Sequence, residues 1–295
     1  MTNYYEYAKS HPEIYKQFSC KDLLFLLCEC PPEFEKSKDW SHYNAFSYVL
    51  SGQVKLHSRE RSWHLHYGDS VFMKKGVWGV EKIEYDSFCS LLFYIPDAFI
   101  RAFVREHISR FSHTDQSLLS SIPALPVESN MVLAAFYESV ASYFMTGTQP
   151  DEELLELKFR ELLLNIVTNP ANSELRAYFY KVAMTDKDDL QDVMERNCLY
   201  HLQPRQYAKL CHRSLSSYKR DFHEAYGISP GRWLLGKRLL HAARLLKQTS
   251  LPVSDITLDC GFKNVAHFDR VFKKRFEISP LQYRKQQLGR LTPLS

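Results

Sequence analysis

The stretch His267-Phe-Asp-Arg-Val-Phe-Lys-Lys-Arg-Phe-Glu-Ile-Ser-Pro280 repeats a pattern found fifty positions earlier, in Ser217-Tyr-Lys-Arg-Asp-Phe-His-Glu-Ala-Tyr-Gly-Ile-Ser-Pro230. Arg220 matches Arg270 and Phe222 matches Phe272, and the Ile-Ser-Pro triplets coincide. Aromatic residues match aromatic residues at three further pairs of positions: Tyr218/Phe268, Tyr226/Phe276 and Trp233/Tyr283. An internal repeat reveals the unit from which a protein is built. The pattern predicts that this unit is a short basic helix behind a turn.

The second copy has the layout of a helix-turn-helix. Pro252 begins a predicted helix, which ends at Cys260-Gly261, where Gly can adopt the left-handed conformation of a tight turn. Asn264 can cap the next helix. In that helix the apolar residues fall on one face and a cationic face is left outside, as a helix that contacts DNA requires. The predicted inner face holds Phe268, Val271 and Phe272.

The first copy has the same layout, with helices that begin at Pro204 and at about Leu215. Its turn is one residue shorter, and His212 stands where the second copy has Gly261. Because His tolerates a positive φ less well than Gly, we expect this turn to be strained or different. A predicted helix from 231 to 247 joins the copies and is about 25 Å long. It could set both second helices into adjacent major-groove segments, about 34 Å apart.

The charge is unevenly distributed along the chain. Residues 201–290 carry 18 Lys and Arg against 6 Asp and Glu, whereas the whole 295-residue chain carries 38 against 34. An acidic body therefore carries a basic helical module, and a nucleic acid is the partner that such a module favours. The seven cysteines are odd in number and contain no Cys-x-x-Cys pair, which indicates a reducing cytoplasm and neither a disulfide framework nor a zinc cluster. No apolar run is long enough to span a membrane.

The first third of the chain has the pattern of short strands. These segments are rich in aromatic and β-branched residues, are separated by turn signals, and read as a small barrel or sandwich. The predicted strands are Leu23–Glu29, Asn44–Leu50, Gln53–His57, Trp63–His66, Ser70–Met73 and Phe88–Ile95.

Helical patterns follow the strands, at 97–107, 127–145 and from Asp151 to Val167. The last is apolar on too much of its circumference for a single buried face. A helix packed on both sides within its domain and a dimer seam from Leu154 to Val167 explain this equally well. The predicted organisation is a β-rich domain over 1–170, a polar linker region over 171–187, in which 175–184 could be helical, and an all-α domain over 188–295.

The stretch 188–285 closely resembles the paired helix-turn-helix domain of the AraC/XylS transcription regulators. The resemblance rests on Ile256-x4-Gly261-Phe262-x5-Phe268-x-Arg-x-Phe-Lys273 and on Phe276-x-Ile-Ser-Pro280-x2-Tyr-Arg284. The departures are His212 for the usual turn Gly, Thr257 for a usual small Ala, and Asp221 where an apolar residue is common. The strand-rich half resembles, more loosely, the family's cupin-like barrel with flanking helices, through Tyr48-Val-Leu-Ser-Gly52 and Gly68-Asp69-Ser-Val-Phe-Met73. It also resembles the activators of type III secretion genes.

The resemblance implies which residues read DNA. In the family the base-reading positions lie on the outer face of each second helix, which here means Ser216, Lys219 and Arg220, and then Val265, Ala266, Asp269 and Arg270. Arg suits bidentate contact with guanine, and Asp can accept from cytosine. The residues better suited to phosphate contact are Lys263, Lys273, Lys274, Arg213 and His223. For Asp269, an ion pair with Lys273 on the same helix is equally compatible with the sequence.

No catalytic motif stands out, so an enzyme is not expected, and no cofactor or metal is either. His64 and His66 share a strand face and could meet a metal, which leaves a cupin-type metalloenzyme or metal sensor with a DNA-binding tail as the alternative. The expected function is a regulator, more plausibly an activator, that binds promoter DNA as a homodimer and contacts RNA polymerase if it activates. A small-molecule or protein effector would act on the N-terminal domain. A small molecule would enter the barrel interior, with candidate contacts at Tyr48, His57, Trp63, Phe72, Trp78 and Phe93.

Overall fold

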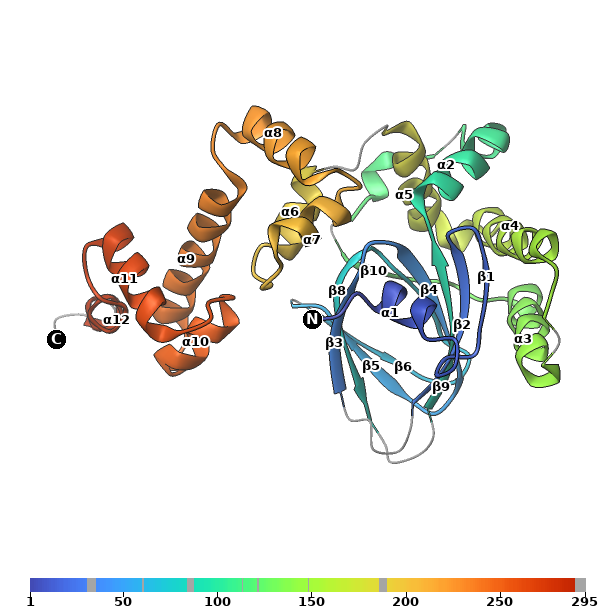
Figure 1. Ribbon diagram of the computed structural model, residues 1–295, viewed down its shortest axis with the longest axis horizontal. Helices are drawn as coiled ribbons and strands as arrows, with labels where there is room; N and C mark the ends of the chain where they lie inside the picture. The colour runs from blue at the N-terminus through green and yellow to red at the C-terminus, as the bar shows by residue number, and fades with distance from the viewer. Residues whose placement is uncertain are drawn as a thin grey trace. The chain divides into compact units, whose positions relative to one another are not determined.

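The computed structural model describes residues 1–30, 36–59, 61–83, 88–112, 114–120, 122–147, 149–185 and 190–289. The chain forms two compact units, Met1–Asp189 and Leu190–Ser295 (Figure 1). Among the described residues, the first unit contains two β-sheets and five α-helices, and the second contains α-helices joined by turns. Among the described residues, no helix is both long enough and apolar enough to cross a membrane.

Two antiparallel sheets form the centre of the first unit. The larger has the strand order β1-β2-β9-β4-β7-β10 and the smaller has the order β3-β8-β5-β6. The strands of the larger sheet are β1 (Gln17–Cys20), β2 (Leu23–Cys30), β4 (Asn44–Ser51), β7 (Ser70–Met73), β9 (Phe88–Ile95) and β10 (Ala124–Pro126). Those of the smaller sheet are β3 (Lys36–Ser41), β5 (Val54–His57), β6 (Ser62–Leu65) and β8 (Gly76–Lys82).

The predicted barrel is wrong in one respect, because the sheets do not close. Within the described residues, β1 and β10 end one sheet and β3 and β6 end the other, so the strands form a two-layered sandwich. The larger sheet is covered by helices on its outer face, and β4 is accordingly buried along most of its length instead of alternating. Even strand spacing is common to barrels and sandwiches. Strand spacing does not indicate which edge strands pair, so the sequence could not distinguish a barrel from a sandwich.

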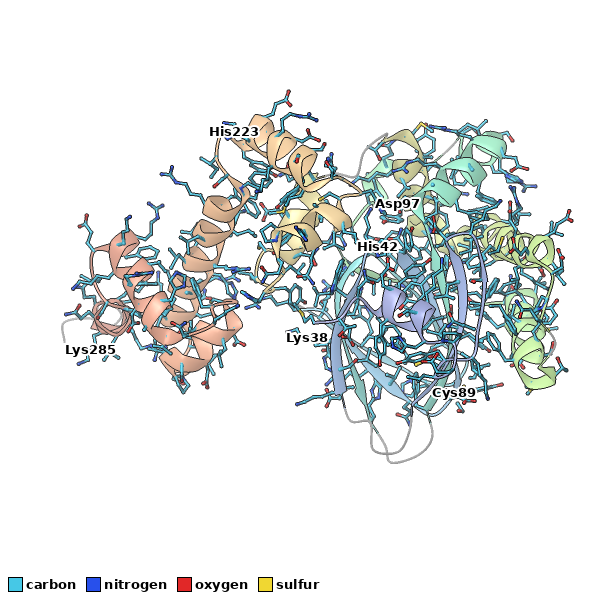
Figure 2. The ribbon with its side chains drawn as sticks, viewed as in Figure 1. Lys38, His42, Cys89, Asp97, His223 and Lys285 are labelled. Atoms are coloured by element: carbon cyan, nitrogen blue, oxygen red, sulfur yellow. The ribbon has the colours of Figure 1, made fainter. Side chains whose placement is uncertain are left out.

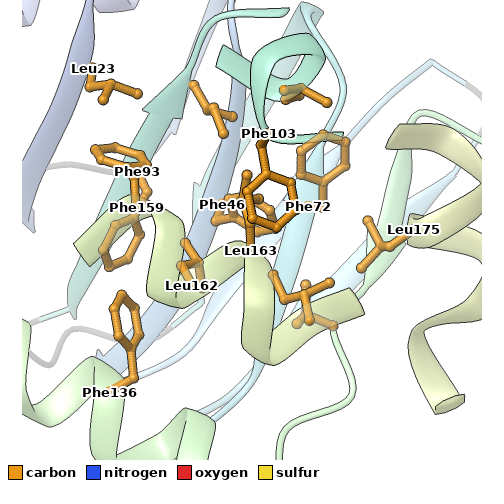
Figure 3. Close-up of a cluster of buried hydrophobic side chains, with 14 of the residues drawn as sticks. Leu23, Phe46, Phe72, Phe93, Phe103, Phe136, Phe159, Leu162, Leu163 and Leu175 are labelled. Carbon is orange, nitrogen blue, oxygen red and sulfur yellow. The ribbon is translucent and has the colours of Figure 1, made fainter. Parts of the chain in front are cut away.

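Four helices cover the outer face of the larger sheet: α2 (Asp97–Glu106), α3 (Met131–Thr146), α4 (Glu152–Thr168) and α5 (Ser173–Met184). Short 3-10 turns lie at Ile108–Phe111, Gln116–Leu118 and Pro170–Asn172, and helix α1 (Tyr4–Ser10) precedes the sheets. The core between helices and sheet is rich in Phe and Leu (Figure 3). Phe159 of α4, for example, lies 4.3 Å from Phe25 of β2 between ring centroids.

Most apolar residues of helix α4 pack within its own unit and do not form a dimer surface. Leu155, Phe159, Leu162, Leu163, Ile166 and Val167 are all buried in the core of their own unit. Leu154 and Leu157 remain exposed, at 37% and 55%. Most of the predicted dimer seam is therefore core. Residues 171–187, expected to hold a linker, contain α5, whose Leu175 and Phe179 are 1% or less exposed and belong to the same core.

A fully buried ion pair joins the sheets to the helices of the first unit. Lys75 Nζ lies 2.7 Å from Asp97 Oδ2, and both side chains are less than 5% exposed. The amide of Asn44 donates to Asp97 Oδ1 at 2.6 Å, and its oxygen accepts from the Tyr178 hydroxyl at 3.1 Å. Figure 2 marks Asp97 at the first residue of α2. The hydrogen bonds connect β4, the turn before β8, α2 and α5.

The second unit contains two helix-turn-helix motifs on either side of a long helix. Helix α6 (Leu190–Asn197) is followed by α7 (Pro204–Leu210) and α8 (Leu215–Tyr226), which form the first motif. Helix α9 (Pro230–Gln248) leads to α10 (Val253–Asp259) and α11 (Val265–Phe276), the second motif, and α12 (Pro280–Gly289) ends the described chain. The 19 residues of α9 span about 28 Å at 1.5 Å per residue.

The aromatic matches of the repeat have the same geometry in both copies. The ring centroids of Phe222 and Tyr226 are 4.4 Å apart, and that of Trp233 lies 5.8 Å and 5.7 Å from them. In the second copy the distances are 4.4 Å, 5.5 Å and 5.4 Å. Those three rings belong to Phe272, Phe276 and Tyr283. Each second helix is thus held to the helix after it by one set of three rings.

Candidate nucleic-acid interface

Helix α8 separates a buried face from an exposed one. Ser214 caps its N-terminus by accepting from the backbone N–H of Ser217 at 3.1 Å. Tyr218 and Phe222 are completely buried, and Ser216, Lys219 and Arg220 are exposed, the Arg220 side chain at 72%. His223, marked in Figure 2, is exposed on the same helix. The residues expected to read bases therefore lie on one outer surface.

The turn before α8 contains one residue in the left-handed conformation. His212 has φ of 48°, the conformation that Gly261 adopts in the second copy with φ of 75°. The expected strain is present, because a side chain with a Cβ disfavours this region. Four residues connect α7 to α8, and five connect α10 to α11.

Arg213, predicted to contact phosphate, is instead an internal residue of the turn. Its side chain is 9% exposed, and its Nε lies 3.0 Å from Asp221 Oδ2. Its Nη1 donates to the carbonyl of Cys211 at 3.2 Å. The sequence pattern predicted an outward charge because Arg213 belongs to a strongly basic segment. The pattern does not reveal that Arg213 and Asp221 form an ion pair.

Helix α11 has the same division. Asn264 caps it by accepting from His267 N at 2.8 Å, and Phe268 and Phe272 are completely buried. The predicted contact residues Lys263, Val265, Ala266, Asp269, Arg270 and Lys273 are all exposed. In the described part of the chain neither Arg270 nor the Asp269–Lys273 pair forms an ion pair. The second outer face is therefore open to a partner.

The second turn is fixed by contacts that sequence reasoning missed. The Arg238 guanidinium, on α9, donates to the carbonyls of Cys198 at 2.9 Å, Tyr200 at 2.7 Å and Gly261 at 3.2 Å. A Cβ on Gly261 would lie 2.6 Å from the Leu199 carbonyl oxygen. The sequence contained one signal for the role of Arg238: it lies between Leu235 and Leu239, near the apolar face of a predicted amphipathic helix. The contacts attach the second motif to the segment before the first.

A cavity of about 310 Å³ lies in the first unit. Residues from both sheets and from the N-terminal segment line it, and the walls are mainly aromatic and aliphatic. Of the six predicted contacts only Trp78 lines it; Tyr48, Phe72 and Phe93 belong instead to the core beneath the helices. The lining aromatic residues that were not predicted as contacts are Tyr4, Tyr7, Tyr15, Trp40, Tyr43, Phe88 and Tyr94.

The polar groups of this cavity are neutral or acidic. Trp40 is 5% exposed, and its Nε1 is buried without a hydrogen-bond partner among the described residues. Burial raises the pKa of Tyr43 to about 12 and also raises the pKa of Tyr94, so both hydroxyls stay protonated at neutral pH. Glu29 pairs with Lys16 at 3.1 Å. No Lys, Arg or His is among the described residues that line the cavity.

The two histidines considered for a metal site lie close to each other. The rings of His64 and His66 are 4.6 Å apart, and His66 Nδ1 lies 3.4 Å from Asp69 Oδ2. The described residues contain no group of three or more His, Cys, Asp or Glu side chains placed to hold a metal ion.

Two capped helices with buried aromatic faces and exposed cationic faces, each behind a short turn, define a helix-turn-helix DNA-binding regulator. A model of the ExsA N-terminal regulatory domain matches residues 44–178, and a helix-turn-helix domain model matches residues 207–286. The chain belongs to the AraC/XylS family of transcription regulators.

Its relatives are regulators as well. The chain is 24% identical over 242 residues to the virulence regulon transcriptional activator VirF of Yersinia enterocolitica, across 82% of this chain and 89% of that one. It is 45% identical over 80 residues, 27% of each chain, to an HTH-type transcriptional regulator of Haemophilus influenzae. A solved structure of ToxT from Vibrio cholerae aligns with 89% of this chain and 97% of its own, at 13% identity and a TM-score of 0.42.

Proposed function

We propose that this regulator reads promoter DNA through the exposed faces of α8 and α11. The single observation that carries the proposal is that both helices completely bury two matched aromatic pairs, Tyr218/Phe268 and Phe222/Phe272, and leave every predicted base-reading residue exposed. Ser216, Lys219 and Arg220 read the first box, and Val265, Ala266, Asp269 and Arg270 read the second. Lys263 and Lys273 contact phosphate, which contributes affinity without sequence information.

The two faces differ, so the site on DNA is two unlike boxes in tandem. Arg220 and Lys219 are long donors suited to guanine, whereas Val265 and Ala266 offer only apolar contact, such as with a thymine methyl. Selection of bound sequences from a random DNA library tests this. We expect two different boxes separated by about one helical turn, with the stronger preference in the first. Recovery of two identical boxes one helical turn apart would contradict the proposal.

We infer that the regulator activates transcription in the cytoplasm and does so as a homodimer. The support for activation is the Yersinia enterocolitica relative, a transcriptional activator that aligns with 82% of this chain. Activation requires productive contact with RNA polymerase, which run-off transcription from a bound promoter measures directly. Increased transcript on addition of the protein supports activation, and decreased transcript supports repression.

A second function is favoured by the cavity between the sheets: binding of a small effector. Pockets for small molecules are mostly apolar, have a few placed polar groups, and measure about 300–1,000 Å³. The cavity fits the lower end of that range. A buried donor without a partner is costly, and Trp40 Nε1 would gain its hydrogen bond from an acceptor on a ligand.

The lining also limits the charge of the ligand. A carboxylate placed there would meet aromatic walls, protonated phenols and the acidic Glu29 and Asp39, and no Lys, Arg or His among the described lining residues would compensate its charge. We therefore propose a flat aromatic effector that carries a hydrogen-bond acceptor and no negative charge.

Three naphthalene probes of similar size separate these requirements: 2-acetonaphthone, 2-naphthoate and 2-ethylnaphthalene. Calorimetry with the full chain should give binding to the ketone about tenfold tighter than to either other probe. Trp40→Phe should lower affinity for the ketone to that for the ethyl compound, and Ala45→Phe, which fills the cavity, should abolish both. Preferred binding of the naphthoate, or no saturable binding of any probe, would exclude this ligand class without affecting the DNA-reading proposal.

A further inference from the structure

One carboxylate on α8 lies between two guanidinium groups. Asp221 Oδ2 accepts from Arg213 Nε at 3.0 Å, and Asp221 Oδ1 accepts from Arg220 Nε at 3.2 Å and Nη2 at 3.1 Å. The two arginines differ in exposure: 9% for the Arg213 side chain and 72% for that of Arg220. Asp221 therefore connects a buried residue of the turn to the exposed arginine of the outer face.

Ser217 completes this group of side chains. Its hydroxyl donates to Asp221 Oδ2 at 3.2 Å and accepts from Arg220 Nη2 at 3.4 Å. Arg220 Nη1 forms no hydrogen bond within the described structure, so this nitrogen is the part of the guanidinium left for a base. Three fixed contacts on Nε and Nη2 reduce the number of rotamers that a long exposed side chain would otherwise sample.

In the second motif, apolar residues occupy the positions that correspond to Arg213 and Asp221. Its turn has one more residue, and that turn places Phe262, 6% exposed, in the core near half-buried Val271, the counterpart of Asp221. Arg213 and Asp221 thus take the place of an apolar pair. Arg270, the counterpart of Arg220, has no hydrogen bond or ion pair among the described residues. In the part of the chain that the structure describes, side-chain contacts connect the turn to the reading arginine in the first copy and not in the second.

We propose that Asp221 is a positioning residue for DNA recognition: anchored to the turn by Arg213, it holds the Arg220 guanidinium in the orientation that discriminates one base pair. The proposal rests on the proposed role of Arg220 as a base-reading residue. Asp221 itself need not touch DNA. The cost is a negative charge close to phosphates, which weakens association with any sequence.

That cost gives the substitution Asp221→Asn two effects of opposite sign. Loss of the charge should strengthen binding to nonspecific DNA and steepen its salt dependence. Loss of the fixed orientation should lower the preference for the cognate base pair at the Arg220 position by about tenfold. Binding constants of the full chain for the cognate site and for its three single-base variants measure both effects. A residue that acted only through charge or stability would move all four constants together.

Glu224→Gln is the matched control, because Glu224 is an exposed acid on the same helix without a contact to Arg220 in the described structure. It should strengthen all binding and leave discrimination unchanged. Adding Asp221→Asn to Arg220→Ala should cause no further loss of discrimination, since the cycle isolates the coupling between the two side chains.

The double variant Arg213→Met with Asp221→Val keeps the test valid if Asp221→Asn unfolds the motif. It gives the first copy an apolar pair like that of the second, and replacement of a buried ion pair by apolar residues is often tolerated. The folded double variant should bind DNA with reduced discrimination at the Arg220 position. Full discrimination in either folded variant overturns the positioning role. If Arg220→Ala itself changes nothing, the proposed reading face fails instead.

Discussion

Arg238 Nη1 lies 3.2 Å from the carbonyl oxygen of Gly261, and this contact joins the long helix α9 to the turn of the second motif. The same guanidinium donates to Cys198 and Tyr200, in the segment between α6 and α7. Nδ1 of His201 is also 3.3 Å from the Gly261 carbonyl. Hydrogen bonds at the Gly261 turn therefore connect the second motif to the segment before the first motif, in addition to the covalent connection through α9.

Gly261→Ala should destabilise the second unit by about 2–4 kcal/mol. The new Cβ would lie 2.6 Å from the Leu199 carbonyl oxygen, and φ of 75° is unfavourable for Ala. Thermal unfolding of the full chain, followed by circular dichroism at 222 nm, measures the change. His212→Gly is the control, because it relaxes a positive φ in an exposed position; it should be neutral or stabilise by about 1 kcal/mol. Equal losses in both variants would contradict the backbone argument.

Arg220→Ala should reduce specific binding by about 1–3 kcal/mol and should relax the sequence preference at one base pair. Its guanidinium is exposed, and Nη1 can donate to an acceptor on the edge of guanine. Gel-shift titration against the cognate site and its base variants checks both effects. Arg270→Ala serves as the comparison, and a loss confined to a different base pair is the expected result.

Lys273→Ala should weaken binding to every sequence and lower the slope of log K against log salt concentration by about 0.9, as loss of one phosphate contact predicts. Filter binding over a series of salt concentrations gives the slope. Lys285→Ala, at an exposed position on α12 outside the proposed faces, should leave the slope as it is. A base-specific loss in Lys273→Ala would assign this lysine to direct readout.

Leu157→Asp should convert a homodimer to a monomer without unfolding the chain. Leu154, Leu157 and Leu164 fall on one side of α4, and Leu157 is 55% exposed, so a charge there is compatible with the fold but not with an apolar contact. Light scattering at micromolar concentration measures the mass. Leu162→Asp, at a completely buried position of the same helix, should instead unfold the first unit. A monomeric unsubstituted chain would remove α4 as a dimer surface.

Lys75→Met should destabilise the first unit by about 3–5 kcal/mol, because Asp97 would then be a buried charge without its cation. Lys75→Met combined with Asp97→Leu should recover part of this loss, since neither charge remains. Urea unfolding monitored by tryptophan fluorescence quantifies both variants. A larger loss in the double variant than in the single one would show that the hydrogen bonds of Asn44 outweigh the ion pair.

The sequence predicted the second unit far better than the first. The internal repeat aligns His212 with Gly261, which predicts that both are turn positions, and both have a positive φ. The strand boundaries of 70–73 and 88–95 were also correct. Closure of the sheets was wrong, because edge pairing depends on contacts between distant segments that leave no local pattern. The role of Trp40 depends on a buried donor without a hydrogen-bond partner among the described residues, and that of Asp221 on the orientation of the Arg213 and Arg220 side chains. Neither property leaves a pattern in the sequence.

The two sets of three rings behind α8 and α11 have nearly the same spacing, although the outward residues differ at almost every position. Internal packing and recognition are therefore encoded by separate residues of one helix. A new operator preference can arise by changes at the outward positions without repacking the interior. Descendants of such a chain could acquire new target genes one half-site at a time, while the other half-site keeps the regulator on its promoter.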